Sequence, residues 1–301
     1  MNLSTPITVE ALKVLDVIDK RGSYAAAAEE LDKVPSALSY VVQKLEEQLD
    51  VTLFQKQGRR SVLTPAGKYL LEEGRDVLNS VERLAEQTQN IARGYETKIR
   101  ISIDTVMNTA PIYEAFKTFL DEFPLIEIDI REDALNGVWE ALITDSVDLV
   151  IGGVDPIPLN KGIRAEKIGE LELVYAVSKN HPLTNEQGPI SQKRLEKERR
   201  VVTHDSAREV VTWTRGLHNS TKHFYVPNTQ SKRKAQLAGL GVGFLPKYLI
   251  ADELASGDLV ALELETPHQQ PNAQHLAWKV VNRGKGLQRL REILKQHISG
   301  K

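Results

Sequence analysis

Small polar and cationic side chains gather in one short stretch near the start of the chain, where they could contact the edges of nucleic-acid bases. Seryl hydroxyls and a glutaminyl amide can bond base edges or phosphates, a tyrosyl hydroxyl can do either, and a lysine suits a phosphate. Small side chains among them would let a helix lie deep in a groove. The residues of this stretch are Ser36, Ala37, Ser39, Tyr40, Gln43 and Lys44.

A second set of cations surrounds a glycine a few residues later. Lys56, Arg59 and Arg60 lie on either side of it, and short β-prone runs at residues 53–54 and 61–63 flank the set. Two such runs around a glycine predict a β-hairpin, and its cationic tip suits the phosphates beside a base-reading helix. The alternative is a solvated turn without a function.

Three short helices would position these side chains. Thr8 predicts the N-cap of the first helix and Gly22 its end. A second helix is expected over residues 24–31, and Pro35 suits the first position of a third helix that continues to about residue 49. A helix, a three-residue turn and another helix have the spacing of a DNA-binding helix-turn-helix. The alternative is an ordinary three-helix bundle with a polar surface.

In a helix-turn-helix the third helix would enter the major groove. We expect Ser23 and Tyr24, at the start of the second helix, to contact DNA as well. Residues 1–64 would then form an all-α winged helix-turn-helix domain. This segment holds eight lysines and arginines against nine acidic residues, and the formal net charge of the whole chain is −2. Any contact with DNA must therefore be local, with the basic groups gathered on one side.

One long helix is expected over residues 65–94, because Pro65 suits its start and strong breakers are absent up to Gly94. About 28 residues at about 1.5 Å each give a helix of roughly 42 Å. An apolar seam with polar flanks predicts pairing with a second copy of the chain, and a dimer would bind an imperfect inverted repeat of DNA. The alternative is a helix packed on its own domain. The seam consists of Leu70, Val77, Val81, Leu84, Thr88 and Ile91.

After residue 94 the pattern changes to alternating strands and helices, which predicts parallel, doubly wound α/β structure. Two such sets follow one another, and a final strand and helix near the end of the chain are expected to return to the first set. We therefore expect one α/β effector domain, residues 95–301, with two lobes. Lobe I would comprise about residues 95–165 and 266–301, and lobe II about residues 166–265.

Two α/β lobes form a cleft, and ligands of open α/β sheets bind beyond the carboxyl ends of the strands. The candidate effector-binding residues are therefore those that directly follow strands. Several are hydroxyl residues near helix starts, where free N–H groups attract anions, although most such hydroxyls are only N-caps. The candidates are Thr105, Val106, Met107, Glu132, Asp133, Gly153 and Asp155 in lobe I, and His204, Asp205, Ser206, Thr229 and Gln230 in lobe II.

Several classes of function find no support in the residues. The chain has no cysteine, no apolar run of membrane-spanning length and no secretory signal at its start, so we expect a cytoplasmic protein without membrane contact. The seven histidines lack a metal-binding spacing, and the GLGVG run at residues 239–243 follows a helix, the reverse of the order in a dinucleotide fingerprint. No nucleophile elbow or convergent acid–base set indicates an enzyme. A solute-binding protein would leave residues 1–93 without a purpose.

The chain resembles the LysR-type transcriptional regulators over essentially its whole length. The N-terminal motifs that carry the resemblance are GSYAAAA at residues 22–28, SALS at 36–39, QKLEE at 43–47, LF at 53–54 and LTPAG at 63–67. The runs DLVIG at 148–152 and AGLGVGFLP at 238–246 are similar to signatures of the sensor lobes. The run VPSALSY at 34–40 resembles a YhaJ-like subgroup, whose members are associated with aromatic inducers.

The resemblance implies a periplasmic-binding-protein-like effector domain that binds a small-molecule coinducer, with no other cofactor and no metal. It also implies a homodimer or homotetramer on double-stranded DNA with dyad symmetry, and contact with RNA polymerase. The family usually has Ser-Gln where this chain has Val34 and Pro35, Arg where Tyr40 stands, and Gly where Asp50 stands. The missing Gln is a common base reader, which puts the usual operator preference in doubt.

Overall fold

The computed structural model describes residues 6–58, 60–158, 161–209, 222–266 and 273–299. The chain divides into two compact units, residues 1–92 and residues 93–301. Each unit has its own hydrophobic core, and each is described by itself below.

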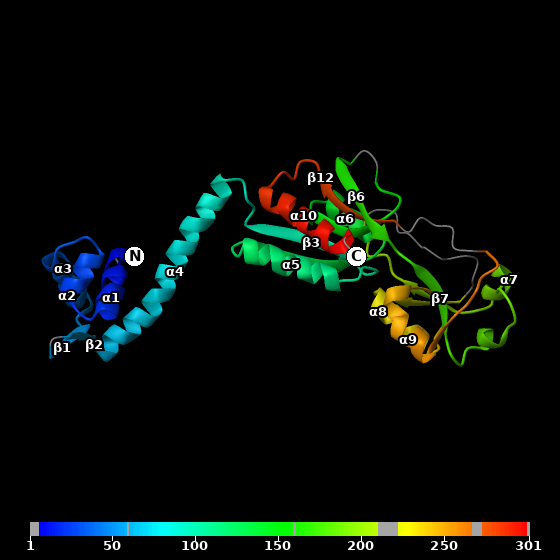
Figure 1. Cartoon of the computed structure of the whole chain (residues 1–301), viewed down its shortest axis with the longest axis horizontal. Coiled ribbons are helices and arrows are strands. Elements are labelled where there is room, and N and C mark those ends of the chain that lie inside the picture. The colour runs from blue at the N-terminus through cyan, green and yellow to red at the C-terminus, as the bar shows by residue number, and fades with distance from the viewer. Residues whose placement is uncertain (1–5, 59, 159–160, 210–221, 267–272, 300–301) are drawn as a thin grey trace. The chain divides into compact units, whose positions relative to one another are not determined.

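Three short helices form the core of the N-terminal unit (Figure 1). The Oγ1 of Thr8 accepts a hydrogen bond from the N–H of Ala11 at 3.1 Å, and Gly22 ends the first helix with a φ of 73°. The Oγ of Ser23 caps the second helix by accepting from the N–H of Ala26 at 3.3 Å. These caps confirm the predicted helix boundaries to within a residue. The helices are α1 (Val9–Arg21), α2 (Tyr24–Glu30) and α3 (Pro35–Leu49).

The third helix begins without a side-chain cap. Val34 is extended, and Pro35 occupies the first turn, where its missing N–H is of no consequence. Leu38, Val42 and Leu45 are buried on the inner face of α3. The helix ends at Asp50, which adopts the left-handed conformation with a φ of 53°. An aspartate tolerates this region better than most residues, so it can stand where a glycine would be expected.

The predicted hairpin is present, as strands β1 (Phe54–Gln57) and β2 (Arg60–Leu63) pair antiparallel. The N–H of Ser61 donates to the carbonyl of Gly22 at 3.0 Å, which fixes β2 beside the turn between α1 and α2. The carboxylate of Glu46 on α3 accepts from the N–H of Leu53 at 2.6 Å. The hairpin is therefore held against the helix-turn-helix at both ends.

The long helix α4 (Pro65–Ala92) has the predicted length. Its first half packs on its own unit, because Leu71, Gly74 and Leu78 are buried against α1. A Cβ atom at Gly74 would lie 2.6 Å from Cδ2 of Leu12, so the glycine permits this close approach. One face of the helix therefore packs on its own unit, while three residues of the predicted seam are exposed, Val77 by 48%, Leu84 by 65% and Ile91 by 57%; pairing of the helix with a second copy stays a prediction.

Lobe I of the second unit is a five-stranded sheet of order β4-β3-β5-β12-β6 with helices on both faces. Helices α5 and α10 pack together on one face, and α6 covers the other with Trp139 (Figure 1). The strands are β3 (Lys98–Asp104), β4 (Glu127–Asp133), β5 (Leu149–Val154), β6 (Ile163–Glu170) and β12 (Ala273–Lys279). The helices are α5 (Ala110–Glu122), α6 (Asn136–Ile143) and α10 (Lys285–Ser299).

The prediction of a parallel first set is confirmed, because strands β3, β4 and β5 are parallel. The final strand, β12, for which no direction was predicted, is antiparallel to both of its neighbours, β5 and β6. The chain reaches β12 on its way back from lobe II, so this strand enters the sheet from the opposite end. The predicted return of the chain to the first lobe is confirmed.

Lobe II contains a three-stranded sheet of order β10-β7-β11 and the separate pair β8-β9. The pair is parallel, as expected, whereas β7 is antiparallel to β10 and β11, which corrects the prediction of a second parallel set. The strands are β7 (Leu173–Ser178), β8 (Arg200–Thr203), β9 (His223–Val226), β10 (Gly243–Pro246) and β11 (Leu259–Ala261). The α-helices are α7 (Gln192–Leu195), α8 (Thr229–Leu237) and α9 (Ala251–Ser256). The short 3-10 turns are η1 (Pro182–Asn185) and η2 (Lys247–Ile250).

Two further sequence expectations concern lobe II and membranes. A helix was expected near Ser206, but residues 204–209 are not helical and residues 210–221 lie outside the described part of the chain. Within the described ranges, every helix is too short or too polar to span a bilayer.

Candidate DNA-reading surface and effector cavity

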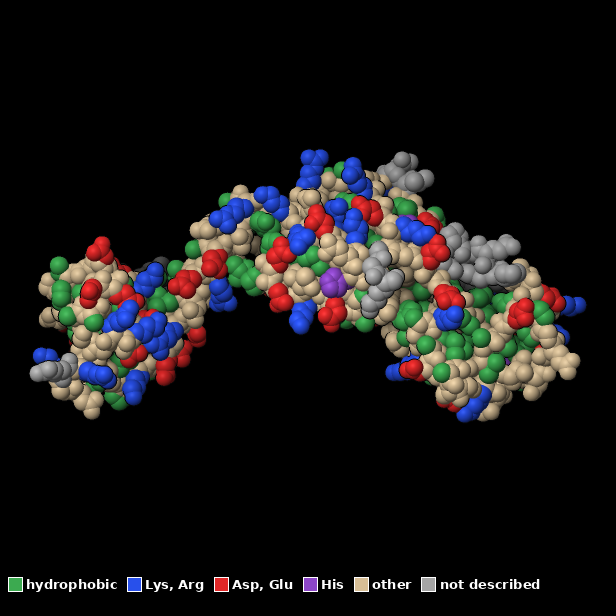
Figure 2. Space-filling view, in the orientation of Figure 1, with side chains coloured by type: hydrophobic (Ala, Val, Ile, Leu, Met, Phe, Trp, Pro, Cys, Tyr) green, Lys and Arg blue, Asp and Glu red, His purple; other side chains and the backbone are tan. Residues whose placement is uncertain are grey.

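Helix α3 presents most of the predicted base-reading side chains to the outside of the N-terminal unit. Ser36, Ser39, Gln43 and Lys44 are exposed, and Tyr40 is 65% exposed. Ala37 is half-buried. In Figure 2, basic and acidic side chains alternate over the visible face of this unit rather than forming one large basic patch.

Several of these groups already have local partners. The Oγ of Ser39 donates to the carbonyl of Pro35 at 3.0 Å, and Nε2 of Gln43 donates to the carboxylate of Glu47 at 2.9 Å. The second N–H and the Oε1 of Gln43 remain available to a base, because the bond to Glu47 uses only one N–H. Arg60 is exposed on β2. Arg59, the other predicted cation of the hairpin tip, lies outside the described residues.

Ser23 and Tyr24 support the fold of the motif. The Ser23 hydroxyl is the N-cap of α2. The ring of Tyr24 meets that of Phe54 edge-on, with 5.9 Å between centroids, and burial raises the pKa of Tyr24 to about 12. Both side chains are half-buried, so they position α2 and the hairpin relative to each other.

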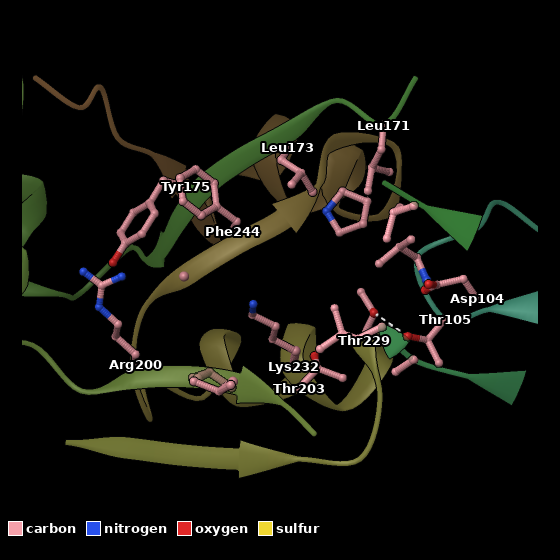
Figure 3. Close-up of a pocket in the computed structure, with 18 of the residues that line it drawn as sticks. Asp104, Thr105, Leu171, Leu173, Tyr175, Arg200, Thr203, Thr229, Lys232 and Phe244 are labelled. Carbon is pink, nitrogen blue, oxygen red and sulfur yellow. Dashed lines mark hydrogen bonds between the residues drawn. The ribbon is translucent and has the colours of Figure 1, made fainter. Parts of the chain in front are cut away.

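In the second unit a cavity of about 130 Å³ lies between the lobes and extends into lobe II (Figure 3). We call it the interlobe cavity. Lobe I contributes Asp104, Thr105, Val106, Ala134, Leu135 and Val154. Lobe II contributes mainly apolar and aromatic side chains together with two cations, among them Leu171, Leu173, Tyr175, Arg200, Thr229, Lys232, Val242, Phe244 and Pro246.

Lys232 projects from the first turns of α8 into this cavity (Figure 3). Among the described residues, no carboxylate lies within 4 Å of its ammonium group and no hydrogen-bond acceptor contacts it. Burial, and then the nearby charge of Arg200, lower the pKa of Lys232 to about 8. Arg200, at the start of β8, is itself only 4% exposed. Two positive charges therefore face a space with largely apolar walls, an arrangement that an anion would stabilise.

The aromatic wall of the cavity consists of Tyr175 on β7 and Phe244 on β10. Their rings meet edge-on, with 4.9 Å between centroids. Burial raises the pKa of Tyr175 to about 12, so this phenol is neutral at physiological pH. Its buried hydroxyl makes no hydrogen bond with the described residues and can bond a bound molecule.

The two lobes meet at the lobe I end of the cavity. The Oγ1 atoms of Thr105 and Thr229 lie 3.0 Å apart and share a hydrogen bond (Figure 3). The hydroxyl of Tyr248 donates to the carbonyl of Val106 at 3.1 Å. The carboxylate of Asp104 is occupied locally, because it accepts from the N–H of Val106 at 3.1 Å. Thr105, Val106 and Thr229, all predicted from their place after strands or near helix starts, thus line the cavity.

The other predicted effector contacts of lobe I do not line the cavity. Met107 is 7% exposed in the lobe I core, and Gly153 lies against the ring of Trp139. Glu132 is exposed and Asp155 is half-buried outside the cavity. The carboxylate of Asp133 is buried and pairs with Arg131 at 2.6 Å. Glu132, Asp133 and Gly153 lie within the ends of β4 and β5 rather than after them, and these predicted residues lie in the core or at the surface.

The remaining predictions in lobe II also lie elsewhere. His204 is exposed and stacks on Tyr225, with 4.9 Å between centroids, and Gln230 is exposed. Asp205 and Ser206 instead bind lobe I. The Asp205 carboxylate accepts from the N–H of Gly137 in the first turn of α6 at 3.0 Å, and the Ser206 hydroxyl accepts from the N–H of Ala134 at 3.0 Å. We call this pair of contacts the interlobe latch.

Sequence reasoning missed the two cations and the aromatic pair of the interlobe cavity. Lys232 lies one helical turn after Thr229 on α8, so its place beside a predicted site residue was a usable signal. Arg200 opens a short apolar strand, RVVT, where a charged residue is unusual. Nothing in the chain order brings Tyr175 and Phe244 together, because their contact depends on the antiparallel pairing of β7 and β10.

The sequence matches two family profiles. One is described as "LysR substrate binding domain" and matches residues 92–299. The other is described as "Bacterial regulatory helix-turn-helix protein, lysR family" and matches residues 9–68. Together they cover the helix-turn-helix and the whole second unit.

Curated relatives extend over most of the chain. The probable HTH-type transcriptional regulator YhaJ of Escherichia coli (strain K12) is 37% identical over 263 residues, which is 86% of this chain and 87% of that protein. The HTH-type transcriptional regulator PunR of the same strain is 34% identical over 272 residues, 89% of this chain and 86% of that protein.

Solved structures share the fold at low sequence identity. An OxyR mutant of Corynebacterium glutamicum has a TM-score of 0.59 at 18% identity and covers 100% of this chain and 95% of its own. A full-length BenM mutant has a TM-score of 0.52 at 20% identity and covers 96% of this chain and 95% of its own. At such identities the likeness concerns the fold alone.

Proposed function

The chain belongs to the LysR family of DNA-binding transcription regulators, which are not enzymes, and on this premise we propose how it reads DNA and senses its effector. The family gives the chain a DNA-binding domain and an effector-binding domain. Which residues read the operator, how many copies act together and what the effector is are the parts we propose.

We propose that two chains pair along the exposed seam of α4 and present their α3 helices to the half-sites of an imperfect inverted repeat. Val77, Leu84 and Ile91 are large apolar residues that lie at a spacing of seven on one exposed stripe, which is typical of helix pairing. Ser36, Ser39, Tyr40 and Gln43 face the major groove, and Lys44 with the hairpin cations Arg59 and Arg60 contacts phosphates. Further pairing to a homotetramer and contact with RNA polymerase are part of this proposal, and membership of the family supports them.

The DNA-binding proposal is tested with Arg60→Ala and a matched control. A phosphate contact contributes equally on every sequence, so this variant should bind operator and unrelated DNA more weakly alike, with a flatter salt dependence. Arg199→Ala, an exposed arginine of the second unit, serves as the control. Unchanged binding by the Arg60 variant between low and moderate salt would remove the hairpin from the interface.

We propose that the effector is a small organic anion, a carboxylate with an apolar or aromatic body, held in the interlobe cavity. One observation carries this proposal: the ammonium group of Lys232 points into an apolar-walled cavity and has no acidic partner among the described residues. Arg200 adds a second positive charge, and Tyr175 and Phe244 offer an aromatic wall. A carboxylate would neutralise Lys232, while its body would cover the apolar wall.

The effector proposal is tested by isothermal titration or thermal shift of the full chain against matched acids, amides and amines that share the same apolar bodies. We expect acids to bind, and we expect the neutral amides and the amines to fail. Lys232→Met should abolish binding, whereas Lys234→Met, an exposed lysine on the same helix, should leave it intact. Equal binding of an acid to the Lys232 variant would exclude the proposed role of this cation.

The position of the interlobe cavity suggests how binding reaches the DNA-binding domain. A ligand that touches both lobes stabilises one separation of them, and the regulator's activity then depends on the populations of open and closed effector domains. A bacterial transcription regulator must reach DNA in the cytoplasm, so we propose that the protein is cytoplasmic.

A further inference from the structure

A second group of cations surrounds a hollow on lobe I that belongs to neither the DNA-reading surface nor the interlobe cavity. The hollow measures about 410 Å³ and lies between the edge strand β6, the loop after β12 and the first turns of α10. Arg164, Arg283 and Arg291 line it, one from each of these elements. Three arginines thus converge from segments that are distant in sequence.

None of these three arginines forms an ion pair with a carboxylate among the described residues. Other arginines of lobe I are paired: Arg100 with Asp148 at 2.7 Å, and Arg289 with Glu122 at 3.1 Å. The three arginines without an ion pair therefore lie together around this hollow.

The carboxylates around the hollow are already occupied. Glu166 pairs with Lys295 at 2.7 Å, and Glu292 pairs with Arg289 at 3.3 Å. Glu96, beside the loop, caps α10 by accepting from the N–H of Gly286 at 3.0 Å. The positive charge of the three arginines is thus incompletely balanced from within the lobe.

Arg291 is held in a fixed position at the floor of the hollow. Its guanidinium carbon lies 3.4 Å from the centroid of the Trp278 ring, and this ring is only 4% exposed. Burial lowers the pKa of Arg291, and its Nε–H is buried without a hydrogen-bond partner among the described residues. A buried donor of this kind is rare in native proteins and is satisfied by a ligand or an ordered water. The cation–π contact keeps the guanidinium in place for such a partner.

We propose that this hollow is a second ligand site of lobe I and binds a small phosphate-type dianion. Three guanidinium groups offer forked donors that match the oxygens of phosphate, and the side chains of Asn282 and Gln288 line the same hollow. Three cations call for more than one negative charge on the ligand. The site is concave and lined by side chains from three elements, which suits a small molecule better than an extended polyanion.

The test exploits the place of Trp278 beneath Arg291. The chain has three tryptophans, so full-length protein labelled with 5-fluorotryptophan gives few fluorine resonances, and a Trp278→Phe variant identifies the relevant one. Inorganic phosphate is titrated against sodium chloride of equal ionic strength. We expect the Trp278 resonance to move saturably with phosphate alone. Trp139 lies on the opposite face of the sheet, where its Nε1–H donates to the carbonyl of Val154 at 3.0 Å, and its resonance should stay in place.

The variant Arg164→Ala/Arg283→Ala removes two exposed cations and leaves the Arg291–Trp278 contact intact. It should need at least about tenfold more phosphate for the same shift, whereas Arg199→Ala should behave as wild type. Acetate, with one charge, should also bind at least about tenfold more weakly than phosphate. A Trp278 resonance that fails to move, an unchanged titration in the double variant, or acetate binding as strong as phosphate would each overturn the proposal. The site is independent of the interlobe cavity, so Lys232→Met should leave the phosphate titration unchanged.

Discussion

Lys232 is the residue on which the chemistry of the effector domain depends most. Its ammonium group is surrounded by apolar walls and repelled by Arg200, and both effects lower its pKa to about 8. A lysine in this state is charged or neutral within an accessible range of pH. The proposed anion binds the charged form, and the bound anion raises the pKa again.

Effector binding should therefore depend on pH with a definite sign. Below about pH 8 the ammonium is charged in the empty cavity and affinity is constant; above it, binding must take up a proton, so affinity falls by up to about tenfold per pH unit. Calorimetric titrations across this range should also show proton uptake that grows as the pH rises. Lys234→Met should keep this profile. A flat profile in the wild-type protein would contradict a charged Lys232 as the effector contact.

Residue-level features were predictable where they depend on neighbours in sequence. Thr8, Gly22 and Ser23 act as helix caps because caps depend on local backbone geometry. Thr105 and Thr229 were found from their position after a strand or at a helix start. Lys232 and Arg200 were not, because their convergence depends on how α8 packs on β8, which no short stretch of sequence specifies.

The packing of α4 on α1 depends on a small residue at one contact. A valine at Gly74 would press its Cβ against Leu12, which a glycine avoids. We expect Gly74→Val to lower the free energy of unfolding of the N-terminal unit by about 1–3 kcal/mol, measured by chemical denaturation. Asn79→Val places the same β-branched side chain at an exposed position of the same helix, where it meets no clash, and valine is not a poorer helix former than glycine, so a loss at residue 74 comes from the contact with Leu12. Equal destabilisation by both variants would show that the close approach is unimportant.

The interlobe latch joins Asp205 and Ser206 of lobe II to two backbone N–H groups of lobe I, that of Gly137 in α6 and that of Ala134 just before it. Asp205→Ala leaves the N–H of Gly137 without its carboxylate partner, and Ser206→Ala removes the acceptor of Ala134. Each loss should cost about 1 kcal/mol in the closed form of the lobes, so effector affinity should fall about fivefold. Gln230→Ala, an exposed position outside the cavity, is the control. If the latch variants bind the effector as tightly as wild type does, these contacts do not contribute to closure of the lobes.

Elements with a strong local pattern were predictable, and those defined by their partners were not. The caps and breakers around α1, α2 and α3 and the apolar periodicity of α4 predicted the type and place of these helices. Strand β6 was missed because it is an edge strand with polar residues on both faces, among them Arg164, Glu166 and Lys167. The direction of β12 could not be read from its residues, since parallel and antiparallel strands have similar composition.

At the scale of the whole molecule, the exposed seam of α4 should decide the oligomeric state. A charge at Leu84 and Ile91 would face its own copy across the paired helices and be desolvated there. We expect Leu84→Glu/Ile91→Glu to sediment as a monomer and to lose affinity for an inverted repeat while keeping its helix content. Gln89→Glu, exposed outside the seam, should remain paired. A dimeric double variant would locate the interface elsewhere.

The division into a DNA-binding segment, a long helix and an α/β segment was visible in the sequence because each part has its own periodicity. The extent of α4, residues 65–92, agrees with the prediction to within two residues. The sequence predicted that a cavity lies between the two lobes, but not most of the residues that line it. Its walls come from strands that meet only because the chain crosses between the lobes.

Strand β12 also has a consequence for how the protein is made. It is the inner neighbour of both β5 and β6, so the lobe I sheet stays open between them until residues 273–279 have been synthesised. The strands of lobe II and the helix-turn-helix are all encoded earlier and can fold while translation continues. Lobe I therefore closes after the other described sheets, and the protein cannot respond to its effector before residues 273–279 have left the ribosome.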